Sequence, residues 1–263
     1  MDKSISVFGC GWLGLPMAVK LLANGWQVKG STTTETKLTV LAKQGIEPYL
    51  VHLANITAAD KNFFESEVLL INIPPGLRKQ RGSDYLAQME QLLQVVALSP
   101  VKYVVFISST SVYPELNKVI SDVNEADPDN VLYQSEQLFA ECPQFKTTII
   151  RFAGLIGPGR PPARFFAGRQ NIPNGQAPVN LIHLDDCIGI VEAVLKQEKF
   201  DGVYHAAAPN HPAKQDFYTE AAKHAGLPLP GFVDELLEWK VIESGKIIEE
   251  LGYNISPFSP LQK

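Results

Sequence analysis

A glycine-rich turn near the N-terminus is the first feature whose residue types and spacing point to chemistry. It reads Gly9-Cys10-Gly11-Trp12-Leu13-Gly14 and lies between an apolar strand pattern and a helical pattern. In a GxGxxG turn the first glycine permits a tight bend, the second lets backbone approach a pyrophosphate, and the third lets the helix pack on the strand. The helix N-terminus then faces the anion. The sequence therefore predicts a dinucleotide site at these residues; the alternative is a closely packed turn that binds no ligand.

The stretch after the second predicted strand indicates which dinucleotide is preferred. A site selective for NAD usually carries Asp or Glu about 20 residues after the glycines. Here that place is taken by Ser31, Thr32, Thr33 and Thr34, and the first carboxylate is Glu35. Hydroxyl groups can donate to a 2′-phosphate, whereas a carboxylate repels it, so the sequence favours NADP over NAD. The same hydroxyls suit the cap of the next helix, and the two roles are compatible.

The elements that must position these residues follow one alternating pattern, in which short apolar runs alternate with helical periodicity. We expect strands at 4–8, 27–30, 48–53, 68–73, 103–107, 147–152 and 202–205. We expect helices at 15–24, 37–44, 83–98 (capped by Ser83), 133–142, 185–197, 215–225 and 244–251. Right-handed crossovers then predict a doubly wound parallel α/β sheet, the Rossmann fold.

The pattern changes after Gly157, where glycine, proline and arginine cluster and loops are expected at 157–162 and 171–178. We therefore expect residues 1–156 to form the dinucleotide-binding core. Residues 157–263 are expected to combine a small C-terminal substrate-binding cap with returning core elements, without a linker.

Composition narrows the class of partner. The chain has 263 residues and a net charge of −5, and its basic residues are dispersed, which argues against nucleic acid or an anionic membrane surface. Three widely separated cysteines, Cys10, Cys142 and Cys187, lack the spacing of metal ligands, so no metal site is expected. The sequence has no apolar run of about 20 residues, and its N-terminus leads directly into a strand pattern. We expect a cytoplasmic protein.

Three segments later in the chain resemble one enzyme family. They read Phe106-Ile107-Ser108-Ser109-Thr110-Ser111-Val112-Tyr113-Pro114, Arg151-Phe152-Ala153-Gly154-Leu155-Ile156-Gly157-Pro158-Gly159-Arg160, and Asn180-Leu181-Ile182-His183-Leu184-Asp185-Asp186-Cys187. They are similar to the SS-x-x-VYG, R-x-x-x-x-x-GPG-R and IHVDD segments of extended short-chain dehydrogenases/reductases, the group of nucleoside-diphosphate-sugar epimerases and dehydratases. GxGWLG at the start and RFFAG before Asn180 further resemble an atypical bacterial subgroup named for YeeZ.

This resemblance implies roles for three residues. Ser109 matches the active-site serine, whose hydroxyl bonds the substrate oxygen, and Tyr133 matches the tyrosine that donates or accepts the substrate proton. One helical turn later the family has a lysine, which bonds the nicotinamide ribose and lowers the tyrosine pKa by its charge. This chain has Gln137 there. An amide can still bond ribose but supplies no charge, so the departure puts the acid–base step in doubt. The alternative for Tyr133 is an ordinary aromatic residue at a helix start.

Further residues are implied beside the cofactor and on the substrate side. Asn72, Pro74 and Pro75 fall where the family's chain passes the cofactor ribose, although the prolines also suit a stiff strand exit. Arg160, Arg164 and Arg169, with Phe165 and Phe166 between the last two, fall where the family meets the diphosphate and base of a nucleotide-sugar. Arginine suits phosphate, and an aromatic ring can stack on a base. Solvated arginines and packed phenylalanines are the alternative. His183 is a candidate ligand or acid, or a tie between a loop and the next helix. Asp185 and Asp186 are expected to cap that helix.

Two functions of different class remain open. The first is an NAD(P)-dependent oxidoreductase or epimerase-like enzyme that transfers hydride at a hydroxyl or carbonyl carbon of a small, sugar-linked substrate. The second is a catalytically silent NADP-binding sensor or regulatory protein, which the replacement at Gln137 favours. A third, a two-domain hydroxyacid dehydrogenase, rests on the glycine turn alone and conflicts with the loop-rich segment after Gly157. Twofold symmetry is the commonest closed assembly, and the family pairs through helices corresponding to 83–98 and 133–142, so we expect a homodimer.

Overall fold

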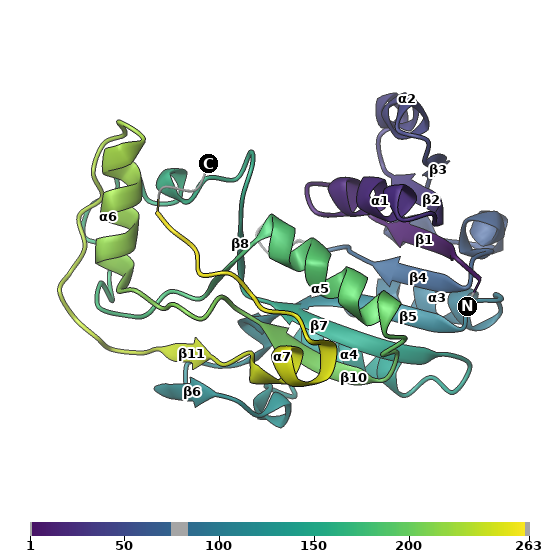
Figure 1. Cartoon of the computed structure of the whole chain (residues 1–263). Coiled ribbons are helices and arrows are strands. Elements are labelled where there is room, and N and C mark those ends of the chain that lie inside the picture. Colours follow the sequence, from purple (N-terminus) through teal and green to yellow (C-terminus); the bar gives the residue numbers. More distant parts are fainter. Residues whose placement is uncertain (1, 75–83, 261–263) are drawn as a thin grey trace. The chain divides into compact units, whose positions relative to one another are not determined.

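The computed structural model describes residues 2–74 and 84–260. These residues divide into two compact units that interleave along the chain. Figure 1 colours the chain by residue number and labels its helices and strands. The first unit comprises Met1–Ser108, Asp127–Ile150 and Val191–Val203, and the second comprises Ser109–Ala126, Arg151–Ile190 and Tyr204–Lys263. The second unit thus takes up an early segment, Ser109–Ala126, as well as most of the chain after residue 157.

A seven-stranded sheet carries the first unit. Its order is β3-β2-β1-β4-β5-β7-β10, and β1 pairs in parallel with both β2 and β4. The bounds are β1 (Ser4–Phe8), β2 (Gln27–Thr32), β3 (Glu47–Leu50), β4 (Val68–Ile71), β5 (Tyr103–Ser109), β7 (Lys146–Phe152) and β10 (Gly202–Ala206). The chain builds outward from β1 in one direction and then restarts on its other side with β4. This is the doubly wound order, so the predicted fold is confirmed, and the direction reverses between β1 and β4.

The central strands explain why these sequences form a sheet rather than helices. All four residues of β4 are buried, and β5 contributes Val104, Val105 and Phe106 at 0% exposure. Continuous apolar, β-branched runs suit strands that are covered by helices on both faces. The sheet is flanked by α1 (Gly14–Ala23), α2 (Glu35–Lys43), α3 (Tyr85–Ala97), α4 (Val131–Ala140) and α5 (Leu184–Lys196).

The second unit contains two short parallel pairs, β6 (Lys118–Ile120) with β11 (Lys240–Ile242), and β8 (Gly154–Ile156) with β9 (Leu181–His183). Its helices are α6 (Lys214–His224) and α7 (Gly245–Leu251), and α5 begins in it. Backbone bonds also join 168–176 to 228–235, including Ile172 N to Gly231 O and Val233 N to Ile172 O. This loop pairing orders a region that the sequence predicts as irregular.

Most predicted elements are present with shifted ends. The third strand stops at Leu50, and Leu53 begins a 3-10 turn instead. Helix α4 begins at Val131, with the Asn130 side chain accepting from Leu132 N at 2.9 Å, so Tyr133 lies inside the first turn rather than at its start. Helix α3 begins at Tyr85, and the expected cap Ser83 lies outside the described residues. The three-residue strands were not predicted, because segments this short carry no measurable periodicity.

Candidate functional site

The glycine turn lies where the winding direction of the sheet reverses. Gly9 follows β1, Asn72 follows β4, and the Asn72 side-chain amide donates to the Gly9 carbonyl oxygen at 3.1 Å. The Asn72 backbone amide donates to Phe8 O at 2.9 Å, which continues the pairing of the two strands. In open α/β sheets, ligands bind beyond the carboxyl ends of the strands at this switch point. The predicted residues Gly9 and Asn72 are therefore brought together there; Pro74 follows in the exposed strand exit, and Pro75 lies outside the described residues.

The three glycines are needed for different reasons. Gly9 has φ +106°, and a Cβ there would lie 2.6 Å from Asn72 O. A Cβ at Gly14 would lie 2.1 Å from Gly9 O, so the start of α1 packs directly on the turn. A Cβ at Gly11 would meet nothing within 4 Å, and its φ is not in the left-handed region. The first and third glycines are thus required by packing, whereas the second leaves open space in front of the turn, as close approach of a pyrophosphate requires.

The side chains between these glycines face in different directions. Cys10 and Leu13 are buried, and burial raises the pKa of the Cys10 thiol to about 12, so this cysteine stays a neutral core residue. Trp12 is half-buried. Helix α1 has no acidic residue in its first turn and no side-chain cap, so its N-terminal amides face no carboxylate of their own helix. This arrangement suits an anion at the turn.

In the segment expected to face the cofactor ribose, Ser31 to Thr34, the structure differs from the expectation at Ser31. The Ser31 hydroxyl accepts a hydrogen bond from Gly9 N at 2.9 Å, its carbonyl accepts from Cys10 N at 2.9 Å, and the residue is 1% exposed. Ser31 therefore holds the glycine turn from within. The Thr32 hydroxyl accepts from Thr34 N at 3.2 Å, whereas Thr33 and Thr34 are exposed at the carboxyl end of β2.

The hydroxyl cluster after β5 forms a defined turn in the second unit. The Ser109 hydroxyl accepts from Ser111 N at 3.1 Å and caps a single 3-10 turn, η5 (Thr110–Val112). Because this bond uses an acceptor lone pair, the hydroxyl proton of Ser109 is left to donate elsewhere. That is the capability expected of a serine that bonds a substrate oxygen.

Helix α4 in the first unit carries Tyr133 and Gln137, both half-buried and one turn apart. Between them Glu136 is 0% exposed, and its carboxylate accepts a hydrogen bond from the Ser108 hydroxyl. Glu136 was not among the predicted site residues. Its position in the buried stripe of α4, between Leu132 and Phe139, is the signal that could have identified a buried acid.

The residues predicted for the substrate side lie in several environments of the second unit. Arg160 and Arg164 are exposed. Phe165 lies 6.0 Å from the Tyr218 ring, in an aromatic cluster that also includes Phe166 and Phe232. His183 Nδ1 accepts from Asp185 N at 3.3 Å, which is the geometry of a tie between β9 and α5. Asp186 bonds the Tyr253 hydroxyl at 3.0 Å and Ser256 N at 3.2 Å, so it holds the C-terminal segment against α5.

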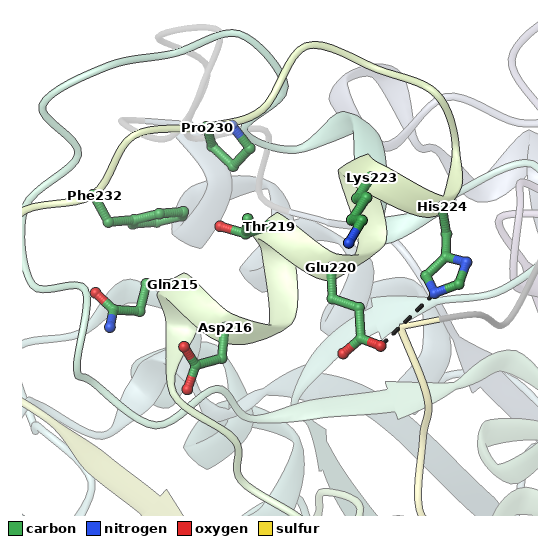
Figure 2. A pocket seen from close by; sticks show the side chains of 8 residues that line it. All are labelled: Gln215, Asp216, Thr219, Glu220, Lys223, His224, Pro230 and Phe232. Atoms are coloured by element: carbon green, nitrogen blue, oxygen red, sulfur yellow. Dashed lines mark ion pairs between the residues drawn. The ribbon is translucent and has the colours of Figure 1, made fainter.

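The second unit also has an open pocket that includes none of these predicted residues. It lies along α6 and is lined by Gln215, Asp216, Thr219, Glu220, Lys223, His224, Pro230 and Phe232 (Figure 2). A dashed line in Figure 2 marks the Glu220–His224 ion pair, in which His224 Nε2 lies 3.7 Å from Glu220 Oε1. Both partners are more than half exposed, so this pair contributes little to stability, and the groove resembles a solvated helix face. Among the described residues, no cluster of His, Cys, Asp and Glu is suited to a metal ion, and no helix is long and apolar enough to cross a membrane.

Comparison with known proteins identifies the chain's relatives. Protein YeeZ of Escherichia coli K12 is 34% identical to this chain over an alignment of 269 positions, which covers 98% of each chain. The chain belongs to the YeeZ family. No family model matches it. Several solved structures resemble the fold of this YeeZ-family protein. Three of them are described below, and the match to each covers at least 96% of the present chain.

The first of these structures is a conserved protein of unknown function from Silicibacter pomeroyi, with a TM-score of 0.71, 22% identity and 93% of its chain covered. The second is UDP-glucuronic acid 4-epimerase from Bacillus cereus in complex with NAD, with a TM-score of 0.77, 20% identity and 93% of its chain covered. The third is a short-chain dehydrogenase/reductase superfamily protein from Agrobacterium tumefaciens with bound NAD, with a TM-score of 0.75, 17% identity and 92% of its chain covered. The resemblance to epimerases and short-chain dehydrogenases/reductases that the sequence motifs suggested is thereby confirmed for the fold.

Proposed function

We propose that this YeeZ-family protein is an NADP-dependent oxidoreductase that transfers hydride at a hydroxyl or carbonyl carbon of a small, nucleotide-linked substrate. The observation that carries the proposal is the difference among the three glycines. Gly9 and Gly14 lie so close to backbone atoms that a side chain would not fit, whereas Gly11 has open space beside it. Packing alone does not require a glycine at position 11. The space there fits the pyrophosphate of a dinucleotide.

The preference for NADP over NAD is supported by the end of β2. Since Ser31 is buried behind the glycine turn at 1% exposure, the preference rests on the hydroxyls of Thr32, Thr33 and Thr34, which can donate to a 2′-phosphate. The first carboxylate after them, Glu35, begins α2. NAD is the cofactor in the complexes of two fold neighbours, so NADH is the competitor that a binding experiment must include.

The chemical step is proposed from the residues that match the family. When bound, the nicotinamide would supply or accept hydride at the substrate carbon. By the match to the family, Ser109 would donate its hydroxyl proton to the substrate oxygen, and Tyr133 would give or take a proton at the substrate. Gln137 would bond the nicotinamide ribose through its amide without adding charge.

The substrate side is proposed to recognise phosphate. Arg160 and Arg164 are exposed guanidinium groups that can bind phosphate oxygens in pairs. Phe165 offers a half-buried aromatic face, and His183 keeps its Nε2 edge for a ligand because Nδ1 is engaged by Asp185 N. The UDP-glucuronic acid 4-epimerase of Bacillus cereus shares the fold at 20% identity, and a nucleotide-linked sugar is the substrate class that we propose for this side.

A second candidate is a catalytically silent NADP-binding sensor, and Gln137 favours it. The family's site has an ammonium one turn after the tyrosine, whereas this chain has a neutral amide at that position. An amide supplies no positive charge to assist the proton transfer. In that case NADP would bind at the glycine turn as a signal, and its binding would change how the protein interacts with a partner.

One experiment separates binding from catalysis. Calorimetric titration with NADPH and NADH is followed by a carbonyl screen that measures loss of NADPH absorbance. Tight NADPH binding with turnover of any carbonyl supports the oxidoreductase, and tight binding without turnover across the screen supports the sensor. Absence of binding to either cofactor would remove both candidates.

We also propose a homodimer in the cytoplasm. The enzymes that this chain resembles pair through helices corresponding to α3 and α4, and a twofold axis lets one face contact its own copy. Light scattering at micromolar concentration tests this directly. A monomer mass would contradict it.

A further inference from the structure

A buried cluster of three polar side chains lies in the second unit, outside the residues assigned above. Arg151 and Tyr113 are each 1% exposed, and His205 is 2% exposed. Arg151 belongs to β7, His205 to β10, and Tyr113 directly follows the η5 turn. A buried guanidinium is costly unless it is well bonded, so this cluster needs a structural or functional reason.

Hydrogen bonds link the three side chains of the cluster in a row. Arg151 Nη1 lies 2.7 Å from the Tyr113 hydroxyl, and a guanidinium only donates, so the phenol oxygen is the acceptor. The phenol oxygen also lies 3.1 Å from His205 Nδ1. We assign the phenol as the donor of this bond, so that His205 accepts at Nδ1 and carries its proton on Nε2. Burial and the Arg151 charge lower the pKa of His205 to about 4, in agreement with a neutral ring.

This chain of bonds ends on the segment that contains Ser109. The same Arg151 nitrogen donates to Val123 O at 2.7 Å, so one guanidinium holds both Tyr113 and Val123, within Ser109–Ala126. On the backbone side, Lys240 Nζ donates to Tyr113 O at 2.6 Å. The Tyr113 amide closes the η5 turn by donating to Thr110 O at 3.2 Å. Tyr113 is thus fixed at its ring, hydroxyl and backbone, immediately after the turn that Ser109 caps.

We propose that Arg151, Tyr113 and His205 are positioning residues that hold the Ser109 hydroxyl in its donating orientation. The orientation matters because the bond from Ser111 N occupies one acceptor direction of the Ser109 oxygen, which limits the directions in which the hydroxyl proton can point. Release of Tyr113 would let the single turn of η5 unwind and would break that bond. The catalytic meaning of this device rests on the proposed function of Ser109, whereas its geometry does not.

The test uses Tyr113→Phe, which removes one hydroxyl and retains the buried ring. Hydrogen exchange of the Ser111 amide, followed by NMR in the full chain, should accelerate by at least about fivefold, because one hydrogen bond typically contributes about that factor. The matched control is Tyr204→Phe, which removes an equally buried tyrosine's bond to Glu250 in the same unit. It should leave Ser111 exchange unchanged. Equal acceleration in both variants, or none in Tyr113→Phe, would overturn the proposal.

A second measurement needs no variant. Nitrogen-15 shifts of His205 in the wild-type chain at neutral pH should report an unprotonated Nδ1 and a protonated Nε2. Protonation at Nδ1 would reverse the order of the bonds and overturn the device. His205→Asn keeps an acceptor near the Nδ1 position and should preserve slow exchange of the Ser111 amide. His205→Leu has no acceptor there, so the Ser111 amide should exchange faster. Equal exchange rates in these two variants would contradict the role of His205.

These readouts involve neither cofactor nor substrate, so the device and the proposed function can fail separately. If the carbonyl screen provides a substrate, Tyr113→Phe should lower kcat at least about fivefold and change KM by less than about twofold, because ground-state contacts remain. An unchanged kcat beside accelerated Ser111 exchange would show that the turn is held for stability alone and would overturn the positioning role.

Discussion

Asn72 and Gly9 face each other across the point where the sheet reverses its winding, and the Asn72 amide donates to the Gly9 carbonyl oxygen at 3.1 Å. Ser31 holds the same glycine from the other side, by accepting from Gly9 N at 2.9 Å. The turn is therefore organised by side chains from the ends of β2 and β4. Preorganisation of this kind reduces the ordering cost that a ligand must meet.

The glycine turn makes opposite predictions for two substitutions. Gly11→Val should fold with nearly unchanged stability, because a Cβ there meets no protein atom, and should weaken NADPH binding by at least about a hundredfold through collision with the pyrophosphate. Gly14→Ala should lower the free energy of unfolding by about 2 kcal/mol, because its Cβ overlaps Gly9 O. Urea unfolding and calorimetry measure the two effects. Undiminished binding in Gly11→Val would refute a dinucleotide at this turn.

The end of β2 predicts a change of cofactor preference. Thr33→Asp places a carboxylate on an exposed position next to the proposed 2′-phosphate, and NADPH affinity should fall by about tenfold, which corresponds to about 1.4 kcal/mol. NADH affinity should stay equal or rise. Thr39→Asp, an exposed substitution farther along α2, controls for net charge. Tighter binding of NADH than NADPH by the wild-type chain would contradict the assignment to NADP.

The replacement at Gln137 predicts a gain of activity. Gln137→Lys adds an ammonium one turn after Tyr133, and a nearby positive charge favours the phenolate form of a tyrosine. Alcohol oxidation should therefore rise at neutral pH, or its optimum should move to lower pH. Tyr133→Phe in the same background should abolish the gain. If Gln137→Lys changes nothing while NADPH still binds, the sensor becomes the better assignment.

The neutral His205 predicts how stability depends on pH. Its pKa is lowered from 6.5 to about 4 by burial and by Arg151 and Lys246, against the opposing charges of Asp122 and Glu125. Between pH 4 and 6.5 the unfolded chain therefore binds more protons at this site than the folded chain does. Stability should rise as pH increases through this window, and the contribution is on the order of 3 kcal/mol.

Denaturant titrations at pH 4.5 and 7 measure this slope, and His205→Asn should reduce it. It should not vanish, because burial also lowers the pKa of His211. An unchanged slope in His205→Asn would mean that His205 titrates alike in the folded and unfolded chains.

Local signals in the sequence determined the order of strands and helices, the doubly wound class and the glycine turn. Apolar runs such as Val68–Ile71 are buried on both faces of any parallel sheet, and the glycine spacing reports a backbone shape that few residues permit. These are properties of neighbouring residues, so they can be recognised without the fold. The motif resemblance reached further along the chain and also indicated the family.

The tertiary structure alone decided which polar groups are already engaged. Ser31 was expected to face the ribose but holds Gly9, and Glu136 pairs with Ser108, its partner being 28 residues away. The Tyr113–His205 bond spans 92 residues. Such partners depend on strand register and on how helices pack, which no local pattern records. A hydroxyl or carboxyl group in the sequence therefore states what chemistry is possible, and only its neighbours in the folded chain determine whether it is free to act.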